Sequence, residues 1–209
     1  MAMIVPLLFL LAWGAPAPDP LAAALERYRD VGSYRVTLRS GHGDDGEVIR
    51  YFYKKPGFIR MEFIRPHKGA LLVYDPMAKT VRLRPFDALK PFVLSLSPDN
   101  SLVKSAQGHR VDESDIGTLL RRVQRLSERG TTVMRGEEKV GARDALIVSV
   151  EGEKGHSQEG IHRYLIWLDR VTLLPLKVTA YDSSGAPVEE VLMDDLEVNV
   201  GLEDSLFKL

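Results

Sequence analysis

The periodic part of the chain begins with a short amphipathic pattern over residues 21–30, where apolar positions recur every three to four residues. Asp19 and Pro20 stand directly before it and suit the N-cap and the first helical position. We therefore expect a short helix over residues 21–30, with one apolar face turned toward the rest of the fold.

From Ser33 onward the apolar positions alternate with polar ones, which is typical of half-buried strands. Turn residues separate these segments at close spacing, and this arrangement indicates an antiparallel meander. In the last segment the phase of the apolar residues changes near Asp194 and Asp195, which predicts a β-bulge. The predicted strands are 33–39, 47–54, 58–64, 70–74, 80–84, 131–140, 145–151, 161–169, 174–181 and 188–200.

The middle of the chain interrupts the alternation. Residues 91–96 predict a short apolar helical segment within a loop. Residues 115–129 predict the longest helix, with Ser114 as N-cap and Gly130 as its end. The apolar stripe of this helix is Ile116, Leu119, Leu120, Val123 and Leu126, and its basic residues away from the stripe are Arg121, Arg122, Arg125 and Arg129.

These elements predict a mainly β fold of the α+β kind. The helices are too few to cover a long meander with one apolar face, and the strands are too many to lie flat. A curved antiparallel sheet satisfies both constraints when it forms an incomplete β-barrel of about ten or eleven strands with a helical lid on its concave face. A dry interior under such a lid suits an acyl chain or another apolar ligand.

The N-terminal residues indicate export. Residues 1–17 are almost entirely apolar, carry no charged side chain and end in Ala15-Pro16-Ala17, the small-x-small pattern of a signal peptidase site. The alternative is a buried N-terminal helix. We expect a signal peptide at 1–17 and a single domain at 18–209 that is soluble, periplasmic and monomeric.

Composition narrows the function. The 209 residues carry a net charge of −1, which argues against a dedicated nucleic-acid binder, and the absence of Cys excludes disulfides, thiolate metal sites and Cys nucleophiles. The five His lack metal-ligand spacing, and Gly155–Gly160 does not match the nucleophile elbow G-x-S-x-G. We expect no catalytic residues, no metal and no cofactor, and therefore no enzymatic activity.

Several segments, taken in order, resemble the LolA-like family of periplasmic outer-membrane lipoprotein carriers. They are Lys54–Phe63, Pro66, Leu71–Asp75, Pro85-Phe86, Pro91–Leu94, Trp167–Arg170, Leu174–Leu176 and Ser205–Phe207. The resemblance covers roughly residues 21–209 and implies an incomplete barrel of about eleven strands with a helical lid. It also implies a cavity for the acyl chains of a lipoprotein, an inner-membrane donor and an outer-membrane acceptor. The same fold serves lipid-sensing regulatory modules that resemble RseB, which is the alternative function.

The resemblance and the patterns together assign residues to the site. The strand residues predicted to line the ligand cavity are Ile59, Met61, Phe63, Leu71, Val73, Val81 and Leu83, and an ordinary hydrophobic core is an equal alternative for them. The residues predicted to line it from the lid are Phe92, Leu94, Leu119 and Val123. The basic residue that latches the lid in the carriers is Arg, and here Lys55 stands at that position, so we expect a weaker latch or none. The basic residues Arg121, Arg122, Arg125 and Arg129 form either a solvated face or a dock for anionic headgroups or an acidic partner, which would allow peripheral membrane contact.

Overall fold

The structure is a computed structural model and describes residues 19–41, 46–86, 92–105 and 107–209. The predicted signal peptide at 1–17 lies outside the described residues. Within the described ranges, no helix is both long enough and apolar enough to cross a membrane.

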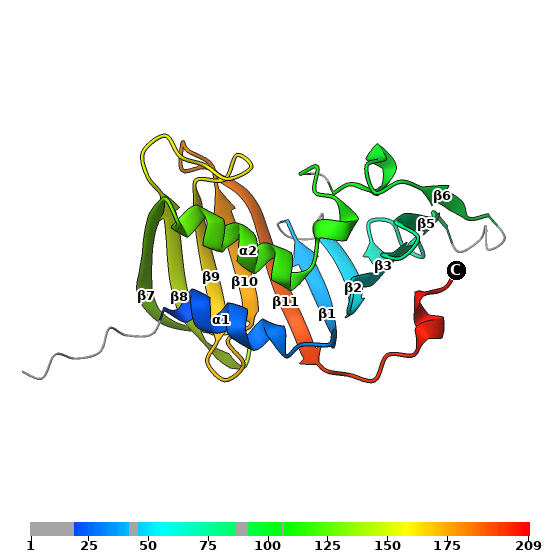
Figure 1. Cartoon of the computed structure of the whole chain (residues 1–209), viewed down its shortest axis with the longest axis horizontal. Coiled ribbons are helices and arrows are strands. Elements are labelled where there is room, and N and C mark those ends of the chain that lie inside the picture. Colours follow the sequence, from blue (N-terminus) through cyan, green and yellow to red (C-terminus); the bar gives the residue numbers. More distant parts are fainter. Residues whose placement is uncertain (1–18, 42–45, 87–91, 106) are drawn as a thin grey trace, which may run out of the picture.

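The described part of the chain forms one open antiparallel sheet of eleven strands with two α-helices on one of its faces (Figure 1). The order of strands is β6-β5-β4-β3-β2-β1-β11-β10-β9-β8-β7, so β1 pairs with β11 and joins two consecutive meanders. The ends β6 and β7 do not pair, and the predicted incomplete barrel is confirmed. The strands are β1 (Ser33–Ser40), β2 (Glu47–Lys54), β3 (Phe58–Arg65), β4 (Leu71–Asp75), β5 (Thr80–Arg84), β6 (Leu94–Leu96), β7 (Gly130–Val140), β8 (Arg143–Gly152), β9 (Arg163–Asp169), β10 (Pro175–Tyr181) and β11 (Pro187–Val198).

The two helices are α1 (Pro20–Arg29) and α2 (Ile116–Ser127), which contact each other and lie over the half of the sheet formed by β7–β11 (Figure 1). The carboxylate of Asp19 accepts a hydrogen bond from the Leu21 amide at 2.9 Å, which confirms the predicted cap of α1. The predicted cap of α2 is wrong by one residue. Asp115 accepts from the Thr118 amide at 3.1 Å, whereas Ser114 closes the preceding 3-10 turn, η4 (Val111–Glu113).

The predicted apolar stripe of α2 packs into the main core. Leu120, Val123 and Leu126 of this helix are completely buried there, together with inward-facing residues of both meanders. Gly117 marks the point at which α2 meets α1, because a Cβ at this residue would lie 2.2 Å from the Tyr28 ring. The helices therefore form a tightly fitted cover over part of the concave face.

The prediction of a helical segment over residues 91–96 is wrong. Leu94–Leu96 is the short edge strand β6, which pairs with Val81–Leu83 of β5 and so lengthens the wall of the half-barrel. Pro91 lies outside the described residues. The predicted bulge in β11 is confirmed, since the register against β1 shifts there and Asp195 adopts a φ of 53°.

The C-terminal segment covers the opposite, convex face of β3 and β4. This segment contains the 3-10 turn η5 (Asp204–Phe207), whose Phe207 ring lies 5.8 Å from the Phe58 ring. Arg60 Nη1 donates a hydrogen bond to the Leu206 carbonyl at 2.8 Å, and Lys54 Nζ donates to the Leu202 carbonyl at the same distance. The convex face of β3 and β4 is consequently covered by the C-terminal segment.

Candidate functional site

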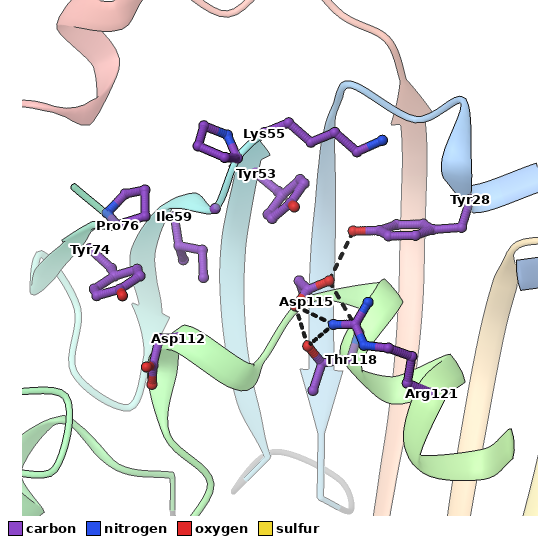
Figure 2. A pocket seen from close by; sticks show the side chains of 12 residues that line it. Tyr28, Tyr53, Lys55, Ile59, Tyr74, Pro76, Asp112, Asp115, Thr118 and Arg121 are labelled. Carbon is purple, nitrogen blue, oxygen red and sulfur yellow. Dashed lines mark hydrogen bonds and ion pairs between the residues drawn. The ribbon is translucent and has the colours of Figure 1, made fainter. Parts of the chain in front are cut away.

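A pocket of about 460 Å³ lies where the concave side of β2–β4 meets the start of α2 (Figure 2). Its volume falls within the roughly 300–1,000 Å³ of small-molecule sites. Aromatic and apolar groups form much of the wall, and charged groups stand among them. The lining residues are Tyr28, Tyr53, Lys55, Pro56, Gly57, Ile59, Tyr74, Pro76, Asp112, Asp115, Thr118 and Arg121.

Stacked tyrosines connect the wall of the pocket to α2. Tyr51 and Tyr53 are two residues apart on β2 and share its concave face, where both rings stack on Tyr34 of β1 at 5.9 and 5.0 Å. The Tyr34 hydroxyl accepts a hydrogen bond from the Ile116 amide, and the Tyr51 hydroxyl lies 3.1 Å from Ser114 Oγ. Burial raises the pKa of Tyr34 and of Tyr51 well above the usual value. These phenols therefore stay neutral and hold the start of α2 against the sheet.

Asp115 is the centre of the polar contacts in the pocket (Figure 2). Its Oδ1 accepts from the Tyr28 hydroxyl at 2.9 Å, and its Oδ2 accepts from Thr118 Oγ1 at 2.5 Å. Arg121 Nη2 lies 4.0 Å from the same carboxylate. Burial, with the charge of Asp115 as a second cause, raises the pKa of Tyr28 well above its ordinary value, so this phenol remains a donor. The carboxylate thus joins α1 to α2 at the edge of the pocket.

Lys55 joins the turn after β2 to α1. Its Nζ donates a hydrogen bond to the Arg29 carbonyl at 2.6 Å and lies 6.0 Å from the centre of the Tyr28 ring. The carbonyl belongs to the last turn of α1, where a cation is favoured by the helix dipole. Lys55 thus contacts helix backbone at the position predicted for the latch, and a latch weaker than the Arg of the carriers stays a prediction.

Most of the predicted ligand wall lies on the concave face. Ile59 is almost completely buried and lines the pocket. Val81 is completely buried in the main core, and Met61, Phe63 and Leu83 are half-buried against it. These four belong to the packed interior beside the pocket and not to its lining.

The placement of Leu71 and Val73 in the cavity is wrong. Val73 lies opposite Arg60 and Arg82 in the register of β3–β5, and these residues face the convex side. Leu71 and Val73 are therefore buried on the face that η5 covers, while Leu72 between them belongs to the concave core. The prediction failed because β4 is covered on both sides. Its consecutive apolar residues do not alternate with polar ones, so the sequence does not indicate which of them face the concave side.

The predicted lid residues divide between α2 and the sheet. Val123 is buried and Leu119 is half-buried against the core, as expected of a covering helix. Phe92 is 51% exposed, and Leu94 lies on the edge strand β6, so neither belongs to a helical lid over the sheet.

The basic residues of α2 do not form one surface. Arg122 is buried, contrary to its predicted place in a surface dock, with its Nη2 3.0 Å from Glu113 and its Nε 2.9 Å from Glu159. These two ion pairs tie α2 to η4 and to the loop between β8 and β9. Arg121, Arg125 and Arg129 remain exposed. Helical periodicity correctly placed Arg122 outside the apolar stripe. It did not predict that the loop between β8 and β9 covers this side chain.

The tyrosines and acids of the pocket were not predicted as site residues from the sequence. Tyr51 and Tyr53 have the spacing of a shared strand face, which was a usable signal. Tyr28 and Asp115 carry no such signal, because they lie 87 residues apart and meet only through the crossing of the helices. Among the described residues, no group of His, Asp or Glu is arranged to hold a metal ion.

Solved structures share this fold. The chain matches a conserved protein from Thermus thermophilus with a TM-score of 0.57 and 12% identity, covering 91% of this chain and 94% of that one. It matches the lipoprotein LppX from Mycobacterium tuberculosis with a TM-score of 0.55 and 11% identity, covering 90% and 99%. It matches MucB in the Pseudomonas aeruginosa MucA/MucB complex with a TM-score of 0.51 and 19% identity, covering 91% of this chain but 60% of that one.

These likenesses establish a common fold, and the half-barrel that was expected from the sequence is confirmed. No curated protein matches the chain in sequence. A family match spans residues 35–209, most of the chain. The chain belongs to the family described as "Protein of unknown function (DUF1571)".

Proposed function

We propose that the protein binds a lipid, or the acylated end of a lipoprotein, between the concave face of its half-barrel and the helices, and carries it through the periplasm. The observation that carries this proposal is the pocket of about 460 Å³ bounded by tyrosine rings, two prolines, Ile59 and the start of α2. Tyrosine rings, prolines and Ile59 on one part of the wall, and charged side chains on another, suit an amphiphile. The resemblance to lipoprotein carriers supports the same function.

Entry of a long acyl chain requires the helices to move. The concave face beside the pocket is filled by Leu120, Val123 and Leu126, which are completely buried. The contacts that would have to open are the hydrogen bond from the Ile116 amide to the Tyr34 hydroxyl and the bond from Lys55 to the end of α1. We therefore assign α1 and α2 the role of a lid that separates from the wall when ligand enters.

The carrier acts by binding alone and performs no chemistry on its ligand. Export through residues 1–17 would place it in the periplasm, with a membrane donor and a membrane acceptor as its partners. The exposed Arg121 and Arg125 of α2 would make the peripheral contact with anionic headgroups.

A lipid-sensing regulatory module is the second candidate function. The observation that favours it is the shared fold with MucB, a protein solved in complex with MucA. In this case the pocket would sense lipid while an outer surface binds a regulatory protein. The two functions differ in what accompanies the protein when it is isolated from cells.

Native mass spectrometry of protein purified from a periplasmic extract tests the proposal. A carrier is expected to retain one bound lipid or an acylated polypeptide, which dissociates when the protein is denatured. A stoichiometric complex with a non-acylated protein would favour the regulatory module. Protein that is recovered only in the cytosolic fraction, with Met1 intact, would contradict the proposed location.

A further inference from the structure

The charged side chains of the pocket differ in how many of their hydrogen-bonding atoms already have a partner within the protein. Asp112 accepts two hydrogen bonds from Arg110, at 3.0 and 2.7 Å, in a planar bidentate pair. Asp115 accepts from Tyr28 and from both the amide and the hydroxyl of Thr118. Both carboxylates are therefore satisfied by donors of this chain.

The two cations that line the pocket keep most of their donors. An ammonium group has three N–H donors and a guanidinium group has five. Lys55 donates one hydrogen bond to the neutral Arg29 carbonyl, and among the described residues its Nζ forms no ion pair with a carboxylate. Arg121 donates to Thr118 Oγ1 at 2.7 Å and is 4.0 Å from Asp115. The pocket therefore offers a ligand hydrogen-bond donors on positively charged side chains.

Lys55 and Arg121 come from different walls. Lys55 projects from the turn after β2, and Arg121 projects from α2, with the Tyr28–Asp115 hydrogen bond between them in Figure 2. Tyrosine rings and Ile59 continue the wall away from these cations. A group with negative charge at one end and an apolar chain at the other matches this distribution of charge and surface.

We propose that the ligand of this pocket is an anionic amphiphile, with a carboxylate or phosphate near Lys55 and Arg121 and an acyl chain along the tyrosine-lined wall. The inference rests on the proposed lipid-binding function and narrows it, because a neutral acylated group would leave the remaining N–H donors of both cations to water. The exposed position of the cations makes the attraction sensitive to salt.

The test compares ligands that share a chain and differ in charge. Palmitate supplies a carboxylate, palmitoyl lysophosphatidate a phosphate, and monopalmitoylglycerol an uncharged head; inorganic phosphate alone is the probe without a chain. Isothermal titration calorimetry of the full chain, below the critical micelle concentrations, gives each Kd. We expect at least one anion to bind about tenfold more tightly than monopalmitoylglycerol, as one charge-assisted hydrogen bond would give, and this ratio to fall in 0.5 M NaCl.

Three variants with the same change of net charge locate the effect. Arg121→Met and Lys55→Met are expected to weaken binding of the preferred anion about fivefold or more and to leave binding of monopalmitoylglycerol within about twofold. Arg129→Met, which changes an exposed residue just after the same helix and outside the pocket, is the control and should leave both unchanged. Because Lys55→Met also removes the contact to α1, Arg121→Met decides the test if the Lys55 variant is unstable.

The outcomes separate the two proposals. Equal affinities for the anions and for monopalmitoylglycerol would overturn the inference and leave lipid binding intact. An effect of Arg129→Met as large as that of Arg121→Met would overturn the assignment to the pocket. Failure of all three acyl ligands to bind the wild-type protein would overturn lipid binding and the inference together. Tighter binding of palmitate, or of lysophosphatidate, identifies which anion the site takes.

Discussion

Replacing Asp115 with Ala should destabilise the protein far more than the loss of an ordinary helix cap. The substitution removes the cap of α2, which costs about 1 kcal/mol. It also leaves the buried Tyr28 hydroxyl without its acceptor, and an unsatisfied buried donor costs about 1–3 kcal/mol. We therefore expect Asp115→Ala to lower the free energy of unfolding by about 2–4 kcal/mol in urea denaturation followed by circular dichroism.

Asp19→Ala is the matched control, because Asp19 caps α1 through a similar bond at 2.9 Å, and this bond stays within α1. It should cost about 1 kcal/mol. A double-mutant cycle of Asp115→Ala with Tyr28→Phe should give a coupling energy of about 1–2 kcal/mol, since the two side chains share one hydrogen bond. The reasoning is refuted if Asp115→Ala costs no more than Asp19→Ala, or if the coupling is zero.

Three further predictions address the helix crossing, the tyrosines and the wall. Gly117→Ala should destabilise by about 1–3 kcal/mol through a clash with the Tyr28 ring, whereas Gly201→Ala, which meets no atom within 4 Å, should be tolerated; equal unfolding midpoints would contradict the tight crossing. Burial raises the pKa of Tyr51, so its contribution to stability is fully present below the ordinary phenol pKa near 10 and is lost as the pH rises above it. The free energy of unfolding should therefore fall above pH 10 less steeply in Tyr51→Phe than in the wild type, and identical slopes would oppose this. Met61 is half-buried in the interior beside the pocket, which an acyl chain reaches only when the helices move. Met61→Glu should therefore lower the melting temperature only slightly and abolish binding of a fluorescent fatty acid; a collapsed fold would assign Met61 to plain core, and retained binding would remove this part of the concave face from the site.

The sheet followed from the sequence because most of its strands have one polar face. In β3, for example, Ile59 and Met61 alternate with Arg60. This alternation predicted both the strand and the side chains that face the core. In β4 the alternation of apolar and polar residues is absent, so it could not predict which side chains face the core. Its four apolar residues in succession gave the strand correctly but left the faces ambiguous, and the C-terminal segment that buries Leu71 on the convex side is far away in sequence.

The pocket was less predictable than the sheet because it depends on contacts between distant elements. Asp115 and Tyr28 are ordinary helix-terminal residues in the sequence, and the crossing of α1 and α2 makes them partners. A three-residue edge strand such as β6 has too few positions to show a period, so the pattern there resembled a helical segment. Local patterns thus specified the half-barrel, while tertiary packing specified the polar centre of the site.

The central claim is that an acyl ligand binds between the concave face and the start of α2, and photo-cross-linking tests it most directly. A palmitate analogue with a diazirine in its chain is irradiated with the purified full chain, and the labelled peptides are identified by mass spectrometry. The account predicts labels on the residues that line the pocket, around Tyr53–Ile59 and Asp115–Arg121, that decrease when unlabelled palmitate competes. Labels confined to the convex face, around Asp204–Phe207, or no label that palmitate displaces, would contradict it.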